Sequence, residues 1–416
     1  MSNAKVHRRQ PSLMAIILPG ILIAATGVGA GDLATASFAG SQLGLAILWA
    51  VVVGSIFKLI LTEGLARWQL VTGHTLLEGL AQRLGPVFAW LFLPYLLLWS
   101  FFVGSALMSA CGVTLHAIFP LFDDASRAKV IFGIGCSLAG LVMVLLGGFK
   151  LFEKVMAACI AVMFAVVLVT AGVLWPGTSE VLQGLTMPSI PDADGKGINW
   201  TVALIGGVGG TLTILCYGYW IREKGRDSAE HIVTCRIDLA TAYALTALFG
   251  IAMVIIGSHL EIQGKGAGLL VNLADTLENP LGTSGRWLFL VGAFGAVFSS
   301  LLGVWQAVPY LFADIYRLFI SKQHDSPVDT QGWPYRGFLF ALAFIPMLGL
   351  MMSFKQVQQF YAIVGAAFLP LLAIALLLMN NRVRDLGKHA NSWSSQALLV
   401  ATIVFFAVIA WMKWSS

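Results

Sequence analysis

Charged residues are scarce in this sequence. Asp, Glu, Lys and Arg make up 11% of the 416 residues, against about a quarter in an average soluble domain. Hydrophobic residues make up 58%, and the mean hydropathy is +0.85. A chain with few charges and many long apolar runs is predicted to be an integral membrane protein that crosses the bilayer several times.

Cysteine is also scarce, and its placement argues against two kinds of structural cross-link. The five cysteines are scattered, and none forms a CxxC pair or a cluster with histidine. Neither a disulfide framework nor a zinc site is predicted. A Ser-His-Asp set, a P-loop and a dinucleotide-binding fingerprint are also missing from the sequence, so nothing in it indicates an enzyme or a resident cofactor.

The basic residues carry information about orientation. Most of the 25 Lys and Arg residues fall in short segments on one side of the predicted spans, where they set membrane topology rather than bind nucleic acid. They predict a cytoplasmic N-terminus and an external C-terminus in a multi-pass protein of the cell membrane, which we expect to be a bacterial inner membrane. The first apolar run is too long for a signal peptide and holds Asp32, so it is expected to be a retained helix.

Apolar runs predict eleven membrane-spanning helices. Because five is an odd number, a second set of five spans enters the membrane with the opposite orientation to the first. The predicted fold class is an all-α integral membrane protein of the LeuT type, with a 5+5 inverted repeat and broken helices 1 and 6. The predicted spans are 13–40, 44–66, 86–118, 128–148, 152–175, 198–221, 234–258, 286–316, 334–352, 357–380 and 395–414.

These spans divide the chain into four parts and a linker. The predicted parts are a cytoplasmic N-terminal tail (1–12), a first five-helix repeat (13–175), a second inverted repeat (198–380) and an additional C-terminal helix (395–414). Residues 176–197 are polar and rich in turn-forming residues, and they are expected to form an ordinary connecting loop.

Glycine interrupts the first and sixth spans at matching places in the two halves. The first span holds Gly27-Val28-Gly29-Ala30-Gly31-Asp32, and the sixth holds Gly206-Gly207-Val208-Gly209-Gly210-Thr211. Glycine is a poor helix former, and a charge at the bilayer centre costs at least ~3 kcal/mol on insertion scales. Paired broken helices of this kind indicate a transporter binding site. Unwound backbone is therefore predicted near Gly27–Gly31 and Gly206–Gly210.

Asp32 has two interpretations, which can hold together. It could cap an outer half-helix that begins at Leu33, since Asp is a favoured N-cap residue. It could also bind a substrate or ion together with backbone carbonyls, because hard cations prefer oxygen ligands. The second break offers carbonyls and the hydroxyls of Thr211 and Thr213, with close helix packing through small residues as the alternative.

Four further ionisable residues lie within or near apolar runs. Glu63 and Arg67 are spaced i, i+4 and can pair on a helix. Lys58 lies deeper in the same run and requires a partner or a route to the interface. Asp238 in the seventh span is a candidate for a buried ionic role. A structural ionic network is the favoured interpretation of these residues, and a gate is the alternative.

The run Gly31-Asp32-Leu33-Ala34-Thr35 resembles the first-helix motif of the Nramp (natural resistance-associated macrophage protein) divalent-metal transporters. That motif reads Asp-Pro-Gly-Asn, then a hydrophobic residue, Ala and Thr. The resemblance covers spans one to ten, and it implies a LeuT-type fold and metal transport by alternating access. Further landmarks follow in the family's order, namely Gly104-Ser105-Ala106, Gly147-Gly148-Phe149-Lys150-Leu151-Phe152-Glu153, Asp238, Ser299-Ser300 and Leu369-Pro370.

The departures from the family pattern fall on the site itself. Aligned on Ala34-Thr35, the family's metal-binding Asp is replaced by Gly29, and its Asn is replaced by Asp32. In the sixth span, Thr213 stands where the family has its thioether ligand. Two family histidines and the acidic pair of the family's proton route fall on Leu215, Trp220, Leu98 and Phe101.

These replacements change the expected cargo. Loss of the soft sulfur removes the preference for transition metals, and loss of the histidines and acids removes the obvious proton carriers. The remaining oxygen ligands suit a hard ion, as in the Nramp-related magnesium transporters, whose metal ligands are also altered. We expect a carrier of Mg²⁺ or Mn²⁺ with a site formed by Asp32, Gly29, Gly210, Thr213 and Thr211.

A carrier for a small organic solute such as an amino acid is the alternative on the same fold. The N-termini of the broken helices near Leu33 and Thr211 could bind a carboxylate, and Asp32 could hold an amine or a coupling ion. In either case the partners are the transported species and the lipid bilayer, with no nucleic acid.

Overall fold

The computed structural model describes residues 29–146, 149–192, 195–260, 266, 268–322, 328–382 and 386–415, which are helical nearly throughout. The elements of the first half are η1 (Ala30–Thr35), α2 (Ala36–Leu43), η2 (Gly44–Ile47), α3 (Leu48–Thr72), α4 (Leu76–Leu84), α5 (Pro86–Ile118), α6 (Ala125–Leu146), α7 (Phe149–Val173) and α8 (Thr178–Thr186).

The second half follows with a similar order of long helices. Its elements are α9 (Gly197–Gly207), η3 (Leu212–Leu215), α10 (Cys216–Glu223), η4 (Ala229–His231), α11 (Ile232–Ser258), α12 (Leu269–Phe319), α13 (Trp333–Phe344), η5 (Ile345–Met351), α14 (Phe354–Ala366), α15 (Phe368–Asn380), η6 (Gly387–His389) and α17 (Trp393–Ser415).

Membrane-spanning helices make up most of this structure. In the described part of the chain, nine helices are long and apolar enough to cross a bilayer, or ten if a pair bent by 113° counts as one span. The longest stretch, Gly31–Thr72, contains the outer end of the predicted first span and all of the second. The two are separated at Gly44, where φ is +63°. The predicted all-α, multi-span fold class is confirmed.

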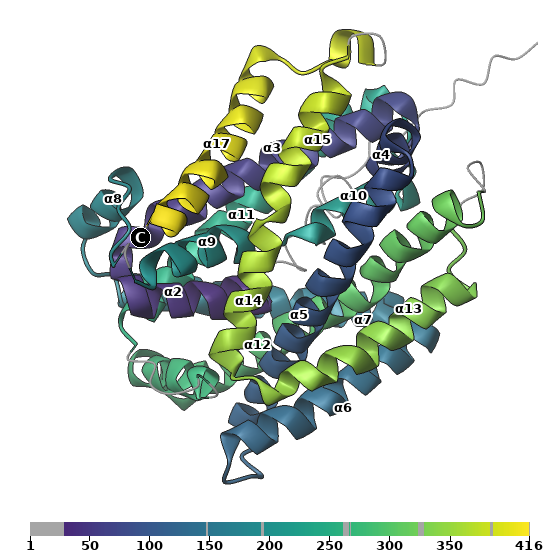
Figure 1. The fold of residues 1–416 in the computed structure, drawn as a ribbon. Coiled ribbons are helices and arrows are strands. Elements are labelled where there is room, and N and C mark those ends of the chain that lie inside the picture. The colour runs from purple at the N-terminus through teal and green to yellow at the C-terminus, as the bar shows by residue number, and fades with distance from the viewer. Residues whose placement is uncertain are drawn as a thin grey trace, which may run out of the picture.

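The packing of the helices repeats between the two halves. Helix α5 packs against α6 and α14, and its counterpart α12 packs against α13 and α7. Likewise α2 contacts α11, while α9 contacts α3. Figure 1 shows α2, α9 and α14 near the middle, with α6 and α13 side by side at one edge and α17 beside α15. Corresponding helices therefore make corresponding contacts, as an inverted repeat requires.

The prediction of an ordinary loop over 176–197 was wrong, because this segment contains the helix α8. Helix α8 follows α7 at the 113° bend. Val181 and Gly184 lie on its buried face, and a Cβ on Gly184 would lie only 2.2 Å from the carbonyl oxygen of Leu45. A short helix therefore covers the turn between the first two spans, and its packing against η2 stabilises it.

The predicted break in the sixth span is confirmed. Helix α9 ends at Gly207, Val208 is extended, and the chain resumes helical structure only at Leu212. Gly209 and Gly210 have φ angles of +77° and +76°, which are readily adopted only by glycine. This backbone explains why the sequence requires glycine here.

The first break is described only from its outer side. Gly29 is not helical, with φ −97° and ψ −121°, and helical structure begins at Ala30. Gly27 and Val28, which belong to the predicted break, lie outside the described residues. The described part therefore agrees with a half-helix that starts inside the glycine run.

The two breaks touch each other through glycine. A Cβ on Gly31 would lie 2.3 Å from the carbonyl oxygen of Gly207, which is too close for any side chain. Gly206 makes a similar approach to the carbonyl oxygen of Ala362 in α14, and a Cβ on Gly365 would lie 2.6 Å from Cγ2 of Thr211. Small residues thus allow three helices to meet at one point.

Replacing Gly31 by Ala is expected to destabilise the protein, because the new methyl group would press on backbone that cannot move aside. Overpacking of this kind costs about 1–3 kcal/mol. The control is Gly135→Ala on the exposed face of α6, where an added Cβ has open space. Thermal unfolding in detergent should show a lower midpoint for Gly31→Ala than for Gly135→Ala. Equal midpoints would contradict the glycine contact.

Candidate functional site

Asp32 joins the two broken helices. Its side chain is fully buried, and its Oδ2 accepts a hydrogen bond of 3.2 Å from the backbone N–H of Gly209. The residue lies inside the first turn of its own helix, whose N-cap is Gly29 and has no side-chain cap. The cap interpretation is therefore wrong for the half-helix itself. The carboxylate instead reaches across to the other break.

One oxygen of this carboxylate is unsatisfied. Oδ1 of Asp32 has no hydrogen-bond partner in the described part of the chain. A buried polar atom without a partner costs free energy, so such atoms are rare in native proteins and call for an explanation. A bound cation or donor at this position would provide one.

Lys58 is buried beside the second break. Its Nζ donates a hydrogen bond of 2.9 Å to the carbonyl oxygen of Gly206 and another to that of Val208. The side chain is fully buried in the middle of α3, and it lies within electrostatic range of Asp32. The partner that the sequence requires for this lysine is thus the backbone of the break.

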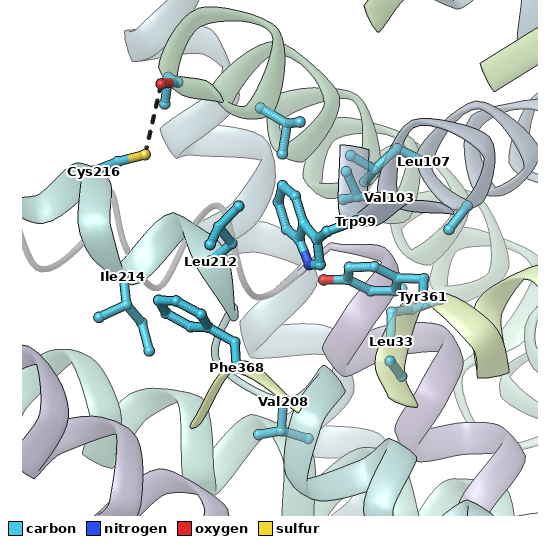
Figure 2. Packing of buried hydrophobic residues seen from close by; sticks show 14 of the residues in the cluster. Leu33, Trp99, Val103, Leu107, Val208, Leu212, Ile214, Cys216, Tyr361 and Phe368 are labelled. Carbon is cyan, nitrogen blue, oxygen red and sulfur yellow. Dashed lines mark hydrogen bonds between the residues drawn. The ribbon is translucent and has the colours of Figure 1, made fainter. Parts of the chain in front are cut away.

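Thr211 is held by an aromatic pair that no motif indicated. The indole N–H of Trp99 donates a 2.8 Å hydrogen bond to the Thr211 hydroxyl. Trp99 and Tyr361 lie with ring centroids 6.4 Å apart, and Figure 2 shows the Tyr361 hydroxyl turned toward the indole nitrogen. Tyr361 also lies within electrostatic range of Asp32. Tryptophan is frequent throughout this chain, so its type and position gave no signal.

The other predicted site residues gather at the same breaks. Thr213 is buried, and a Cβ on Gly210 would lie 2.7 Å from its hydroxyl oxygen. A Cβ on Gly29 would lie 2.0 Å from Oγ of Ser300, so the first break also packs on α12. Among the described residues, no three His, Cys, Asp or Glu side chains converge as a metal-binding group. Any ion would depend on hydroxyl and carbonyl oxygens around a single carboxylate.

The predicted ionic network is not one network. Glu63 pairs with Arg67 at 3.2 Å, as its spacing predicts, and also with Arg236 of α11 at 2.8 Å. Arg67 donates to the carbonyl oxygen of His389 at 2.7 Å. Lys58 belongs to the breaks instead. Sequence spacing could predict only the contact within one helix.

Asp238 forms a second, separate group. It is fully buried and accepts hydrogen bonds from Arg226 at 3.0 Å and from the Tyr217 hydroxyl at 2.9 Å. The predicted buried position of Asp238 is correct. Its partners connect the start of α11 to α10, which continues from the sixth-span break.

A third charged cluster was missed. Arg317 lies 2.6 Å from both Glu78 and Asp314, and Asp314 accepts a 2.7 Å hydrogen bond from Tyr219. Thr75 and Glu78 form a capping box at the start of α4. These residues line a cavity of about 210 Å³ and join α4, α10 and α12. The Thr-x-x-Glu pattern was the available signal.

The third span presents different residues from those aligned with the family's acids. Leu98 is 50% exposed on the outer surface of the protein, whereas its neighbour Trp99 is fully buried. Position 98 therefore faces away from the breaks. The residue of this helix that contacts the sixth-span break is Trp99, whose indole donates a hydrogen bond and carries no acidic group.

Comparison with known proteins agrees with this architecture. A family model described as natural resistance-associated macrophage protein-like matches residues 20–415. The metal transporter Nramp3 of Oryza sativa subsp. japonica is 23% identical, covering 97% of this chain and 75% of the rice protein. A divalent metal cation transporter MntH from Aeromonas hydrophila is 21% identical, covering 94% of each chain.

Solved structures show the same fold. A manganese transporter from Eremococcus coleocola, in complex with an aromatic bis-isothiourea compound, superposes with a TM-score of 0.72 at 17% identity, covering 98% of this chain and 88% of that one. MhsT in complex with L-phenylalanine gives 0.65 at 16% identity, covering 97% and 99%. At these identities the similarity establishes the LeuT-type fold alone.

Thr211→Val is expected to destabilise the protein, because the buried indole N–H of Trp99 loses its acceptor. An unsatisfied buried donor costs about 1–3 kcal/mol. The matched control is Thr114→Val, since among the described residues the Thr114 hydroxyl donates to the carbonyl oxygen of Ala110 in its own helix. Unfolding midpoints in detergent check the difference. A Thr211→Val midpoint as high as that of the control would contradict the role assigned to this bond.

Proposed function

We propose that this chain, which belongs to the Nramp family over residues 20–415, is a secondary transporter that carries a divalent metal cation between its two broken helices. The family match and the LeuT-type fold support transport as the function. The relatives described above include a rice metal transporter and a bacterial divalent metal cation transporter. We extend the metal cargo of these relatives to this chain.

One observation carries the choice of a cation. Oδ1 of Asp32 is buried between the breaks without a partner in the described residues. A buried carboxylate is stable only when a charge or donors compensate it. A cation at this oxygen would supply that compensation, with Thr213, Thr211 and the carbonyls of Gly29 and Gly210 as further oxygen ligands.

The chemistry of this ligand set favours hard ions. Its donors are a carboxylate, hydroxyls and carbonyls, without sulfur or imidazole, and such donors suit Mg²⁺ or Mn²⁺ rather than softer metals. Transport would proceed by alternating access, with the enclosed site opening to each side in turn. Tyr219 and Asp314, which tie α10 to α12, would separate when the inner half of the sixth span moves.

Asp32→Asn is expected to abolish most uptake while leaving the protein folded, because the amide removes the charge that holds the ion. Loss of a buried charge pairing of about 3 kcal/mol or more corresponds to a fall of over a hundredfold in affinity. The measurement is Mn²⁺ and Mg²⁺ flux into proteoliposomes, with binding measured by calorimetry. Asp275→Asn, at a half-exposed carboxylate, is the control. Unchanged flux in Asp32→Asn would exclude Asp32 as a ligand.

Thr213→Met is expected to raise the affinity for Cd²⁺ relative to Mg²⁺, because a thioether binds soft metals and a hydroxyl does not. Competition by each ion for Mn²⁺ binding measures the ratio in wild type and variant. Thr213→Ala, which removes the oxygen without adding sulfur, serves as the control. Wild-type protein that already prefers Cd²⁺ over Mg²⁺ by a large factor would exclude a hard-ion site.

A small organic solute is the second candidate, and Lys58 is the observation that favours it. Its ammonium already binds carbonyls of the sixth-span break, and the buried rings of Trp99 and Tyr361 lie together beside Thr211 of the same break. The same fold occurs in MhsT with L-phenylalanine. Calorimetry with an amino-acid panel separates the candidates. If an amino acid binds and neither Mn²⁺ nor Mg²⁺ does, the transported species is the solute and not the metal.

A further inference from the structure

We infer that Lys58 is a specificity-determining residue of this carrier, a tethered cation that binds the broken sixth span and compensates Asp32 when no ion is present. The inference rests on the proposed cation transport and deepens it. It predicts that Lys58 weakens the binding of a divalent cation, and that it allows the empty carrier to change its orientation.

The position of Lys58 leaves it no access to water. It lies near the middle of the 25-residue helix α3, and its side chain is fully buried. A lysine near a helix end can extend its charge to the membrane interface, but Lys58 is too far from either end. Its ammonium group therefore has to find compensation inside the protein.

The break provides that compensation through its backbone. Nζ of Lys58 donates to the carbonyl oxygens of Gly206 and Val208, next to the end of α9 at Gly207. Carbonyl groups at the C-terminal end of a helix carry a partial negative charge that favours a cation. Lys58 thus places one positive charge at the end of this half-helix.

The same segment connects Lys58 to Asp32. Val208 accepts from Lys58, and the next residue, Gly209, donates its N–H to Asp32. The two side chains are fully buried and lie within electrostatic range of each other. The positive charge of Lys58 and the negative charge of Asp32 are thus bound to adjacent residues of one unwound segment. There they compensate each other, which lowers the free-energy cost of burying the carboxylate.

A divalent ion at Asp32 would meet this fixed positive charge. Like charges separated by several ångströms in a poorly solvated site repel strongly, so the ion binds only at the expense of the Lys58 contacts. Without the lysine charge the ion would bind more tightly. The empty site would then hold a lone buried carboxylate and freed carbonyls, which hinders movement of the unloaded carrier.

The test compares two Lys58 variants of the full chain, with Mn²⁺ as the probe. Lys58→Met removes the charge and keeps an unbranched side chain that is one atom shorter, and Lys58→Arg keeps the charge. In calorimetry the dissociation constant of Mn²⁺ should fall about tenfold or more in Lys58→Met and stay near the wild-type value in Lys58→Arg. In proteoliposomes net Mn²⁺ uptake by Lys58→Met should fall, whereas exchange of external for trapped Mn²⁺ should persist.

Two other outcomes would contradict either the role of Lys58 or the proposed function. If wild type binds Mn²⁺ and Lys58→Met binds it no more tightly, or if Lys58→Arg tightens binding equally, the tethered-cation role is wrong and metal transport stands. If neither wild type nor Lys58→Met binds Mn²⁺ or Mg²⁺, the proposed function fails and the inference with it. Unfolding midpoints verify that each variant is folded. If Lys58→Met does not fold, Lys58→Gln replaces it, and the same results are expected.

Discussion

The need to satisfy backbone polar groups inside the bilayer determines much of this structure. A transmembrane helix satisfies them internally, but α9 gives up this pattern after Gly207. Each freed group then needs a partner from elsewhere in the protein. Lys58 supplies donors to the carbonyls, and Asp32 supplies an acceptor to the N–H of Gly209. Two buried charged side chains thus provide hydrogen-bond partners for unwound backbone that lipid could not satisfy.

The architecture could be predicted from the sequence because hydropathy and glycine report it directly. Long apolar runs indicate spans, and paired glycines indicate where two of them break. Helix α8 escaped prediction because its apolar face is short and becomes favourable only against η2. In the site, Asp32 and Thr211 were found from their places in the breaks. Their functions remain predictions, since geometry alone establishes position and not cargo.

The contacts that could not be predicted join residues far apart in sequence. The pairing of Glu63 with Arg67 follows from helical spacing, but the bonds from Lys58 to the sixth span cross about 150 positions and have no local signature. The hydrogen bond from Trp99 to Thr211 spans 112 positions and is hidden in the same way. The fold of the family is retained here, so the resemblance predicted the helices, whereas the side-chain contacts at the breaks had to come from the structure.

The contact between Gly31 and Gly207 also has a mechanical consequence. Where side chains of two helices interlock, one helix can move past the other only if these side chains change rotamer and separate. At Gly31 and Gly207 the contact is between backbone atoms, and no side chains interlock there. At the crossing of the two broken helices, a shift of one helix against the other would therefore require no change of side-chain rotamer at Gly31 or Gly207.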